Sequence, residues 1–372
     1  MLHFSIMENP LYYRLALTMV PGISSKIANE LIAIFGDAEA VFKTAATDFD
    51  PELGFTETQI QAIQSFLPNV AVDKEMAFLE KHQIKPLFIK DRDYPQRLLH
   101  IDDPPLLLFS KGPANLNAKR IISIVGTRNN SEYGKQVTEK IIRELPHEDL
   151  LIISGLALGI DGIAHRSALA NGIPTLGVLA HGLDEIYPTQ HQALSKEMCL
   201  SGGLLTDFRK NSVPNKYHFP RRNRIVAGMA DTTIVVESGI KGGSLITADL
   251  ALDYNRALFA VPGRISDQKS AGCNKLIRYS KAYSYINMED FLREMKWWEE
   301  SYSVAKQQDL FFEPTTDQAK LLALFKTKSI ISLDEIQYAA SITSSQLANA
   351  LLALEMQYLI RSLPGNRYTI RI

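Results

Sequence analysis

One short stretch of the chain concentrates side chains that bind anions. Between Asp207 and Arg224 the sequence holds six lysines or arginines against a single acid, with aromatic rings among them. The cations are Arg209, Lys210, Lys216, Arg221, Arg222 and Arg224, and the rings are Phe208, Tyr217, His218 and Phe219. Cations that follow a phosphate backbone, mixed with flat rings on which unpaired bases stack, suit a single-stranded nucleic acid. A solvated basic loop has the same composition, so the neighbouring segments decide between the two interpretations.

Three polar or glycine-rich segments bring further anion-binding groups to the same place. They cover residues 126–134, 154–162 and 237–247, and each follows a predicted strand. In an open parallel sheet, ligands bind beyond the carboxyl ends of the strands, where loops lead into helix N-termini. Arg128 can form two hydrogen bonds to a phosphate, and the turn at Gly243 and Ser244 opens a helix with free amides. A tight turn explains any single glycine, but the convergence of four segments on one edge favours an anion site.

The strands that position these segments are short runs of branched aliphatic residues in the middle of the chain. They cover residues 121–125, 150–154, 175–179, 232–237 and 257–261. Continuous apolar runs of this length are typical of strands buried on both faces. Helices are predicted between them, over residues 135–145, 162–171, 223–230 and 244–254. The alternation predicts an α/β fold with an extended Rossmann-like, doubly wound, mostly parallel sheet.

The two ends of the chain have different patterns. Residues 12–19 and 25–35 predict helices joined by a Pro-Gly turn, as in a small helical domain of the helix-hairpin-helix or SAM-like kind. Such a turn can grip a nucleic-acid backbone, but it is also common helix punctuation, and plain helical packing is the preferred interpretation. Three helices followed by two short strands at the C-terminus predict a winged helix. Its recognition helix, residues 343–355, has no lysine or arginine, which favours packing or protein contact over DNA reading.

These patterns predict four parts of the chain. They are a helical N-terminal domain (1–75), an extended Rossmann domain (76–297), a linker (298–316) and a winged-helix domain (317–372). The linker segment Gln307-Gln-Asp-Leu-Phe-Phe312 is similar to the Gln-x-x-Leu-Phe peptides that dock into the bacterial sliding clamp. Short motifs match by chance readily, so the preferred interpretation is that Leu310, Phe311 and Phe312 pack on the Rossmann domain or the winged helix.

Several classes of enzyme site are missing from the sequence. No Gly-x4-Gly-Lys-Ser/Thr segment is present, which argues against a P-loop and ATP hydrolysis. The spacing of Gly155, Gly159 and Gly162 departs from Gly-x-Gly-x-x-Gly, so NAD binding is not expected. The sequence also lacks Gly-x-Ser-x-Gly, the turn that exposes a serine nucleophile. Asp161 could act as a general acid, but a carboxylate after a glycine turn more often caps a helix or satisfies backbone amides.

The composition is that of a globular chain without a metal or disulfide framework. The chain has 372 residues, of which 46% are hydrophobic and 22% charged, and this length suggests two or three domains. With two cysteines and no helical His-x3-His pair, we expect no metal and no cofactor. No apolar run reaches the roughly 20 residues of a membrane span and no secretory signal is evident, so we expect no membrane contact and a cytoplasmic location. The formal net charge is −1, so polyanion binding must come from local clustering.

The motifs at this sheet edge closely resemble those of the DprA family of DNA-processing proteins, also called Smf. The main matching segments are Ile124-Val-Gly-Thr-Arg128, Ser154-Gly-Leu-Ala-x-Gly-Ile-Asp161, Phe219-Pro-Arg-Arg-Asn-Arg-Ile-Val-Ala-Gly228 and Gly243-Ser-Leu-Ile-Thr-Ala248. The match runs in order from about residue 94 to residue 277. The resemblance implies an extended Rossmann fold that binds single-stranded DNA without catalysis, usually as a homodimer through that domain. It also implies loading of the RecA recombinase onto the strand during natural transformation or homologous recombination.

The resemblance also implies roles for individual residues. Arg128, Ser131 and the Gly243 turn would hold phosphate. Lys216 would meet the backbone while Phe219 stacks or shapes the pocket. The nearby arginines would support them, some by pairing with acids inside the fold. The full set of expected DNA-binding residues is Gly126, Arg128, Ser131, Ser154, Gly155, Lys216, Phe219, Arg221, Arg222, Arg224, Gly243, Ser244 and Thr247.

The alternative function is enzymatic. Rossmann-like enzymes of the nucleoside-monophosphate phosphoribohydrolase type have a Pro-Gly-Gly-x-Gly-Thr turn followed by a catalytic glutamate. The corresponding turn here is Lys241-Gly-Gly-Ser-Leu-Ile-Thr247, and the nearest following acid is Asp249. The missing glutamate favours non-catalytic binding over nucleotide cleavage.

Overall fold

The structure is a computed structural model that describes residues 9–49, 54–297, 314–328, 330–340, 342–356, 359–363 and 365–370. The chain divides into two compact units, residues 1–298 and 299–372. The segment 307–312, which is similar to sliding-clamp peptides, lies outside the described residues.

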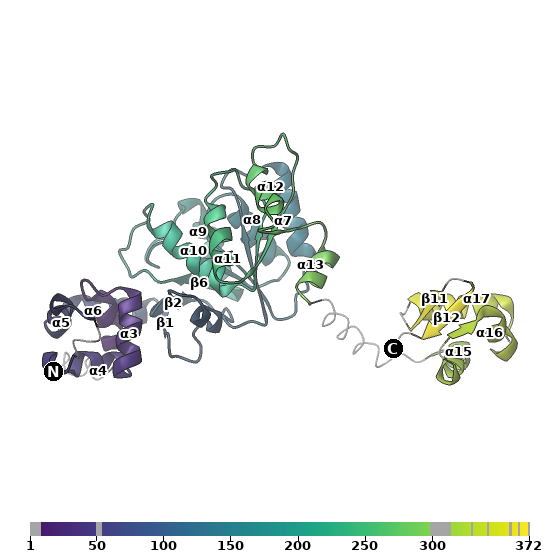
Figure 1. The fold of residues 1–372 in the computed structure, drawn as a ribbon, viewed down its shortest axis with the longest axis horizontal. Coiled ribbons are helices and arrows are strands. Elements are labelled where there is room, and N and C mark those ends of the chain that lie inside the picture. The colour runs from purple at the N-terminus through teal and green to yellow at the C-terminus, as the bar shows by residue number, and fades with distance from the viewer. Residues whose placement is uncertain are drawn as a thin grey trace. The chain divides into compact units, whose positions relative to one another are not determined.

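Helices form the N-terminal part of the first unit (Figure 1). They are α2 (Pro10–Met19), α3 (Ser25–Phe35), α4 (Ala38–Lys43), the 3-10 helix η1 (Ala46–Asp48), α5 (Glu57–Gln64) and α6 (Val70–Lys81). Helix α2 ends before the predicted Pro-Gly turn, where Gly22 has a φ of 79°. The hydroxyl of Ser24 then caps α3 by accepting a hydrogen bond from the N–H of Ile27. Two helices joined by a tight turn are therefore present, as the sequence predicts.

A nine-stranded sheet forms the centre of the first unit, in the order β1-β2-β6-β5-β4-β3-β7-β8-β9. Its strands are β1 (Lys85–Phe88), β2 (Leu107–Lys111), β3 (Arg120–Val125), β4 (Leu150–Ser154), β5 (Thr175–Val178), β6 (Gly203–Thr206), β7 (Thr232–Val235), β8 (Ala257–Ala260) and β9 (Tyr283–Ser284). Every neighbouring pair from β6 to β9 is parallel, whereas β1 and β2 run antiparallel at one edge. The predicted α/β class with a mostly parallel sheet is confirmed.

Helices cover both faces of this sheet. They are η3 (Gln96–His100), α7 (Glu132–Glu144), α8 (Ile160–Ala170), η4 (Thr189–His191), α9 (Gln192–Ser201), α10 (His218–Met229), α11 (Ser244–Asp253), α12 (Ala271–Arg278) and α13 (Met288–Glu294). One core joins the sheet to α10, α11 and α12 through residues such as Met229, Ala248 and Leu276. The other core joins it to α7, α8 and α13 through residues such as Ile141 and Phe291. This layering makes the sheet doubly wound and fixes the loops at its carboxyl edge.

Helix α10 begins five residues before its predicted start at residue 223. The side-chain oxygen of Asn215 accepts hydrogen bonds from the N–H groups of Tyr217 and His218, at 2.9 and 3.1 Å, and this turn starts the helix. Pro220 lies in the first turn, where its missing N–H costs no helical hydrogen bond. With 3.6 residues per turn, side chains three or four positions apart share one side of the helix. The basic stretch is therefore divided between two sides of α10 rather than forming one loop.

The second unit has the layout of a winged helix. Its elements are α15 (Thr316–Thr327), β10 (Ile330–Ser332), α16 (Leu333–Ala340), α17 (Ser344–Met356), β11 (Ile360–Leu363) and β12 (Arg367–Ile370). The three strands pair antiparallel in the order β10-β12-β11. Leu321, Ile336, Leu347 and Leu354 are buried together in its core. The predicted C-terminal winged helix is confirmed.

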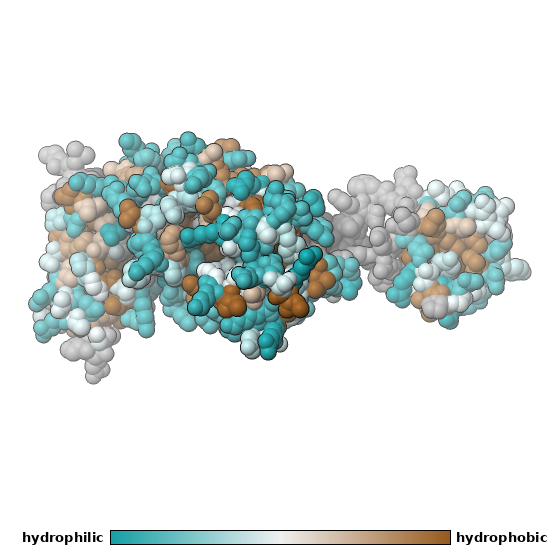
Figure 2. Space-filling view, turned by 90° about the horizontal axis from the view of Figure 1, so that it is seen from above, coloured by the Kyte–Doolittle hydropathy of each residue, from teal (hydrophilic) through white to brown (hydrophobic). Residues whose placement is uncertain are grey.

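The visible surface of the first unit is mixed in character. Figure 2 shows hydrophobic residues scattered singly or in small groups among hydrophilic ones on this face. None of the described helices has both the length and the hydropathy needed to cross a bilayer.

Candidate functional site

A crevice of about 340 Å³ lies where the carboxyl ends of β3, β4 and β7 meet the start of α10. Most of the predicted site residues line it. They are Gly126, Arg128, Gly155, Lys216, Phe219, Arg222, Gly243, Ser244 and Thr247. The structure thus brings together segments that are far apart in the sequence, because each follows a strand whose carboxyl end lies at the same edge of the sheet.

Two exposed cations of the crevice lie beside aromatic rings. The guanidinium carbon of Arg128 lies 5.0 Å from the centroid of the Phe219 ring. The ammonium nitrogen of Lys216 lies 5.0 Å from the ring centroid of Tyr217, which is 72% exposed. Cation–π contacts of this kind hold a charge near a ring without neutralising it. Within the described residues neither cation forms an ion pair, so both charges are available to an anion.

Arg222 is the third cation of the crevice, but it is buried and committed to the fold. Its guanidinium donates to the backbone carbonyls of Gly155 and Val178. Burial lowers the pKa of Arg222 to about 10, and the charge of Asp161 opposes this shift, so the side chain is cationic at neutral pH. Asp161 in turn accepts hydrogen bonds from the N–H groups of Gly155 and Ala157, at 3.1 and 3.3 Å. Arg222 and Asp161 therefore brace the glycine loop that follows β4.

One glycine shapes the crevice, and another precedes a helix that lines it. A side chain at Gly126 would place its Cβ 2.5 Å from the side chain of Ile160, so only glycine leaves room for the close approach of β3 and α8. Gly243 faces open space and precedes α11, where the N–H groups of Leu245 and Ile246 already donate to the carbonyls of Gly242 and Gly243, at 3.0 and 3.2 Å. Among the described residues the N–H of Ser244 has no hydrogen-bond partner, and it is the anion-binding donor that the start of α11 adds beside the exposed cations.

Ser131 and Ser154 are turned into the fold and do not line the crevice. The hydroxyl and the N–H of Ser131 both donate to the carboxylate of Glu237, which is fully buried. Ser131 also caps α7 by accepting from the N–H of Gly134 at 3.1 Å. The hydroxyl of Ser154 donates to the carbonyl of Ile124 at 2.6 Å. The expected phosphate contact of Ser131 is not supported by this geometry, because its donors are already used.

Arg221 and Arg224 lie on the other side of α10 and do not line the crevice, contrary to the single site expected from the sequence. Arg224 is buried and pairs with Asp103 at 2.9 Å and Asp207 at 2.8 Å. Burial alone would lower the pKa of Arg224, but the charges of Asp207 and Asp103 outweigh it and raise the pKa. Arg221 pairs with Asp207 at 3.0 Å and stacks over the ring of Phe208. The arginines on this side are paired to acids, as the resemblance implies for some of the arginines in this stretch.

The histidines behind the crevice form hydrogen bonds within the fold. The Nδ1 atoms of His165 and His191 lie 2.7 Å from the hydroxyl of Thr175 and 2.9 Å from the carbonyl of Leu156. His181 makes a similar bond to the carbonyl of Gly182. Burial lowers the pKa of His165 to about 3, so this ring is neutral. In the described part of the chain no three histidine, cysteine or acidic side chains are grouped to hold a metal ion.

Sequence reasoning missed the division of the basic stretch because it placed the helix start too late. The signals were the Asn215 turn and Pro220, both common at helix starts. It also missed Tyr187, whose ring centroid lies 6.3 Å from that of Phe219 and extends the aromatic surface beside Arg128. Asp103 and Asp207, the partners of Arg224, carried no sequence signal for pairing, because they come from separate loops.

Comparisons with known proteins find related sequences and folds. Residues 85–296 match a family model described as DNA recombination-mediator protein A, and residues 307–366 match the DprA winged helix domain. The DNA processing protein DprA of Bacillus subtilis is 39% identical over 247 residues, which cover 64% of this chain and 82% of that protein. The X-ray structure of DprA from Streptococcus pneumoniae has a TM-score of 0.67 at 32% identity, covering 76% of this chain and 97% of that chain. A structure of Helicobacter pylori DprA, described by its single-stranded DNA binding mode, has a TM-score of 0.52 at 32% identity and covers 57% and 95%.

Proposed function

Because this chain belongs to the DprA/Smf family of DNA recombination-mediator proteins, we propose that it binds single-stranded DNA in the crevice at the carboxyl ends of β3, β4 and β7. One observation carries the proposal: Arg128 and Lys216 are exposed, form no ion pair among the described residues, and line the same crevice as Phe219, whose ring lies beside Arg128. The single-stranded DNA binding described for the Helicobacter pylori relative supports it. In this proposal residues 76–297 form the DNA-binding domain.

The arrangement suits an unpaired strand better than a duplex. A single strand exposes the faces of its bases, whereas a duplex hides them in the stack. Phosphates would lie against Arg128, Lys216 and the N–H of Ser244 at the start of α11, while a base stacks on Phe219. Stacking of this kind contributes about 1 to 3 kcal/mol per base and tolerates any sequence. Binding should therefore be strand-selective and largely independent of sequence.

We propose that the crevice binds without catalysis. Asp161 is the one acid that lines it among the described residues, and its carboxylate is held by two backbone N–H groups. Asp249, the acid nearest the glycine turn, is exposed and pairs with Lys281 at 3.3 Å, and it does not line the crevice. The alternative, nucleotide cleavage, requires that pure protein release free base from nucleoside monophosphates and that Asp249→Ala abolish the release.

Loading of RecA onto the bound strand and homodimer formation through the Rossmann domain belong to the same proposal. The family description as a recombination mediator supports the first. RecA loading predicts that the protein shortens the lag of RecA filament assembly on strands coated with single-strand-binding protein. The homodimer predicts twice the chain mass of 41.6 kDa in light scattering at micromolar concentration.

The decisive experiment is a fluorescence anisotropy titration of labelled oligothymidylate, single-stranded and as a duplex with oligoadenylate, at several salt concentrations. Wild type is compared with Arg128→Ala plus Lys216→Ala. We expect tight, strand-selective binding in the wild type. In the variant the log–log salt slope should be smaller by about 0.7 for each phosphate that is no longer bound.

A matched control removes two cations from the outer face of α7. Lys140→Ala plus Arg143→Ala changes the net charge equally, and neither residue lines the crevice. Binding that is equally weakened by the control, or equally good to duplex, contradicts the proposed site.

A further inference from the structure

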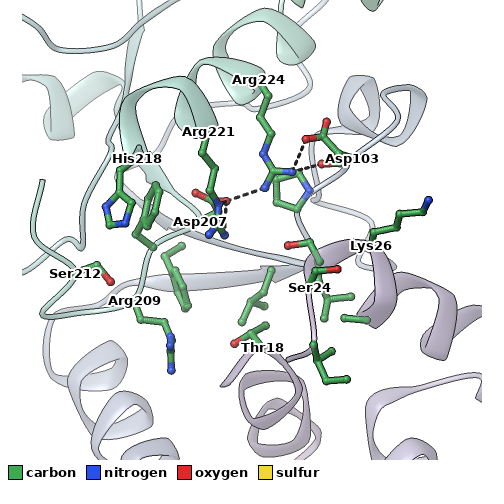
Figure 3. Close-up of a pocket in the computed structure, with 18 of the residues that line it drawn as sticks. Thr18, Ser24, Lys26, Asp103, Asp207, Arg209, Ser212, His218, Arg221 and Arg224 are labelled. Atoms are coloured by element: carbon green, nitrogen blue, oxygen red, sulfur yellow. Dashed lines mark hydrogen bonds and ion pairs between the residues drawn. The ribbon is translucent and has the colours of Figure 1, made fainter. Parts of the chain in front are cut away.

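A second cavity, of about 670 Å³, lies on the opposite side of α10, between that helix and the N-terminal helices. We name it the N-terminal groove. Figure 3 shows His218, Arg221 and Arg224 of α10 across from Thr18 and Ser24 of the α2–α3 region. Lys26 lies at one side of the view, and Arg209 and Ser212 from the segment after β6 lie at the other. The groove is therefore built by two parts of the first unit together.

The charges of the N-terminal groove do not cancel. Its two lining acids already form ion pairs: Asp207 with Arg221 and Arg224, and Asp103 with Arg224. The other lining cations are Lys26 and Arg209, and within the described residues neither forms an ion pair. The buried carboxylate of Glu75 attracts Arg209 from behind the loop, but it accepts its hydrogen bond from the N–H of Lys210. The groove thus offers two cations to an anion.

Only the first turns of α10 separate the N-terminal groove from the crevice. Pro220 lines both cavities, and the neighbouring ring of Tyr217 is 72% exposed beside Lys216. A helix with its side chains is about 10 Å across, so a few nucleotides of an extended strand pass over it. A strand that leaves Phe219 meets Tyr217 on the ridge and then the N-terminal groove. The two cavities therefore adjoin each other across the first turns of α10.

The walls of the groove are fixed relative to each other. Apolar side chains of the N-terminal helices share a core with the sheet edge, where Tyr12 and Leu15 are buried in one cluster with Phe109. The side chain of Asn29 donates to the carbonyl of Pro104 at 3.0 Å, and the ammonium of Lys210 donates to the carbonyl of Lys74 at 3.0 Å. The backbone segments that carry Lys26 and Arg209 are therefore held in place before a strand binds.

We propose that the N-terminal groove is a second contact site for the same DNA strand, in which Lys26 and Arg209 bind phosphates beyond those held in the crevice. This inference rests on the proposed function and extends it. It assigns the N-terminal helices a role in the length of strand that one chain covers. Short oligonucleotides fill the crevice alone, whereas longer ones also reach the groove.

Binding as a function of strand length tests the proposal. The full-length chain is titrated with labelled oligothymidylates of about 6 and about 20 nucleotides, lengths that bracket the site size of a single-strand binding fold. Lys26→Ala plus Arg209→Ala should weaken binding of the longer strand by about tenfold. It should also lower the salt slope by about 1.4, the value expected when two phosphates are released from the protein. Binding of the shorter strand should change less than about twofold, since the crevice is intact.

Two further variants separate a loss of DNA contact from a loss of folding or of net charge. Arg209 is half-buried, so thermal melting must show that the double variant is folded; Lys26→Glu, at an exposed position in the first turn of α3, tests the groove without touching Arg209. An acidic residue there is compatible with the helix start. Lys140→Glu on α7 is its charge-matched control.

Each outcome has a distinct meaning. Selective weakening for the longer strand in both groove variants, with the controls unchanged, supports the second contact site. Equal weakening for both lengths, no weakening for either, or the same weakening in the control overturns it. If the wild type binds neither length, the proposed function itself is contradicted. Binding of the short strand tests that function separately, because the short strand does not reach the groove.

Discussion

The two sides of the first turns of α10 carry the same types of residue and use them differently. On the crevice side, Arg128 and Lys216 lie beside rings and form no ion pair among the described residues. On the groove side, Arg221 and Arg224 are paired with Asp207, whose side chain is 2% exposed. A count of arginines does not separate a binding surface from a structural network. Access to solvent and the absence of a paired acid distinguish the binding surface, because an arginine neutralised by an acid attracts phosphate only weakly.

The largest effect should come from breaking the ion pairs of the groove side. Asp207→Asn leaves Arg224 buried, with only the half-exposed Asp103 as a partner. Removing one partner of a buried pair typically costs about 3 kcal/mol or more. We expect a decrease of about that size in the free energy of unfolding, measured by urea denaturation. Asp103→Asn is the control and should cost less, and equal decreases would show that Asp207 has no special role.

On the crevice side, the free energy of unfolding should depend on acid, because His165, near Arg222, is buried in its neutral form. Burial lowers the pKa of His165 from 6.5 to about 3, so between these values the unfolded chain takes up a proton that the folded chain does not. Stability should therefore fall as the pH falls from 6.5 toward 3, by about 2 kcal/mol at pH 5 from this group alone.

Urea denaturation at pH 7.5, 6 and 5 measures this contribution. His165→Asn keeps a hydrogen-bonding side chain near Thr175 but removes the titration, so its stability should fall less with acid than that of the wild type. Parallel pH profiles of the two proteins would refute a neutral buried His165.

The aromatic and charged groups of the crevice should respond differently to salt. Phe219→Leu removes the stacking surface and should weaken binding of a short oligothymidylate by about tenfold at every salt concentration, within the 1 to 3 kcal/mol expected per stacked base. Arg128→Ala should weaken binding most at low salt, because each phosphate that is no longer bound lowers the log–log slope by about 0.7. Anisotropy titrations over a salt series separate the two, and equal salt slopes for both variants would mean that Phe219 only supports Arg128.

The smallest effect should come from Arg221. Its side chain is 47% exposed, and an ion pair at such a position contributes less than about 1 kcal/mol. Arg221→Ala should change the free energy of unfolding by less than that amount and leave short-strand binding within about twofold. A large decrease in short-strand binding would place Arg221 in the crevice and erase the difference between the two sides.

Much of the sheet could be predicted because its central strands are buried on both faces. β3, β4, β5, β7 and β8 are continuous apolar runs, and the structure places each within two residues of the predicted ends. Four strands of the sheet were not predicted: β2 and β6, which are buried inside the sheet, and β1 and β9, which form its edges. β9 has only two residues, of which Tyr283 is exposed. An edge strand has few buried residues, so its pattern differs little from that of a loop.

The candidate site could be predicted as a location but not in its internal hydrogen bonds. The rule that loops converge at the carboxyl edge of a parallel sheet brought Gly126, Gly155 and Gly243 to one crevice. The partner of Ser131 is Glu237, which is 106 residues away in the sequence, and no local sequence pattern predicts such a pair. Whether a polar group faces a ligand or a buried carboxylate is decided by tertiary packing.

The early start of α10 also restricts where relatives of this chain can differ in length. An extra residue before Asn215 lengthens only the approach to the helix and leaves every later side chain on its present side. The same insertion between Phe219 and Arg222 rotates the following residues by about 100°. Arg222 would then leave Asp161, and Arg224 would leave its two acids. In an alignment of this family, gaps are therefore expected up to the Asn215 turn, and a gap placed between His218 and Arg224 indicates misaligned residues.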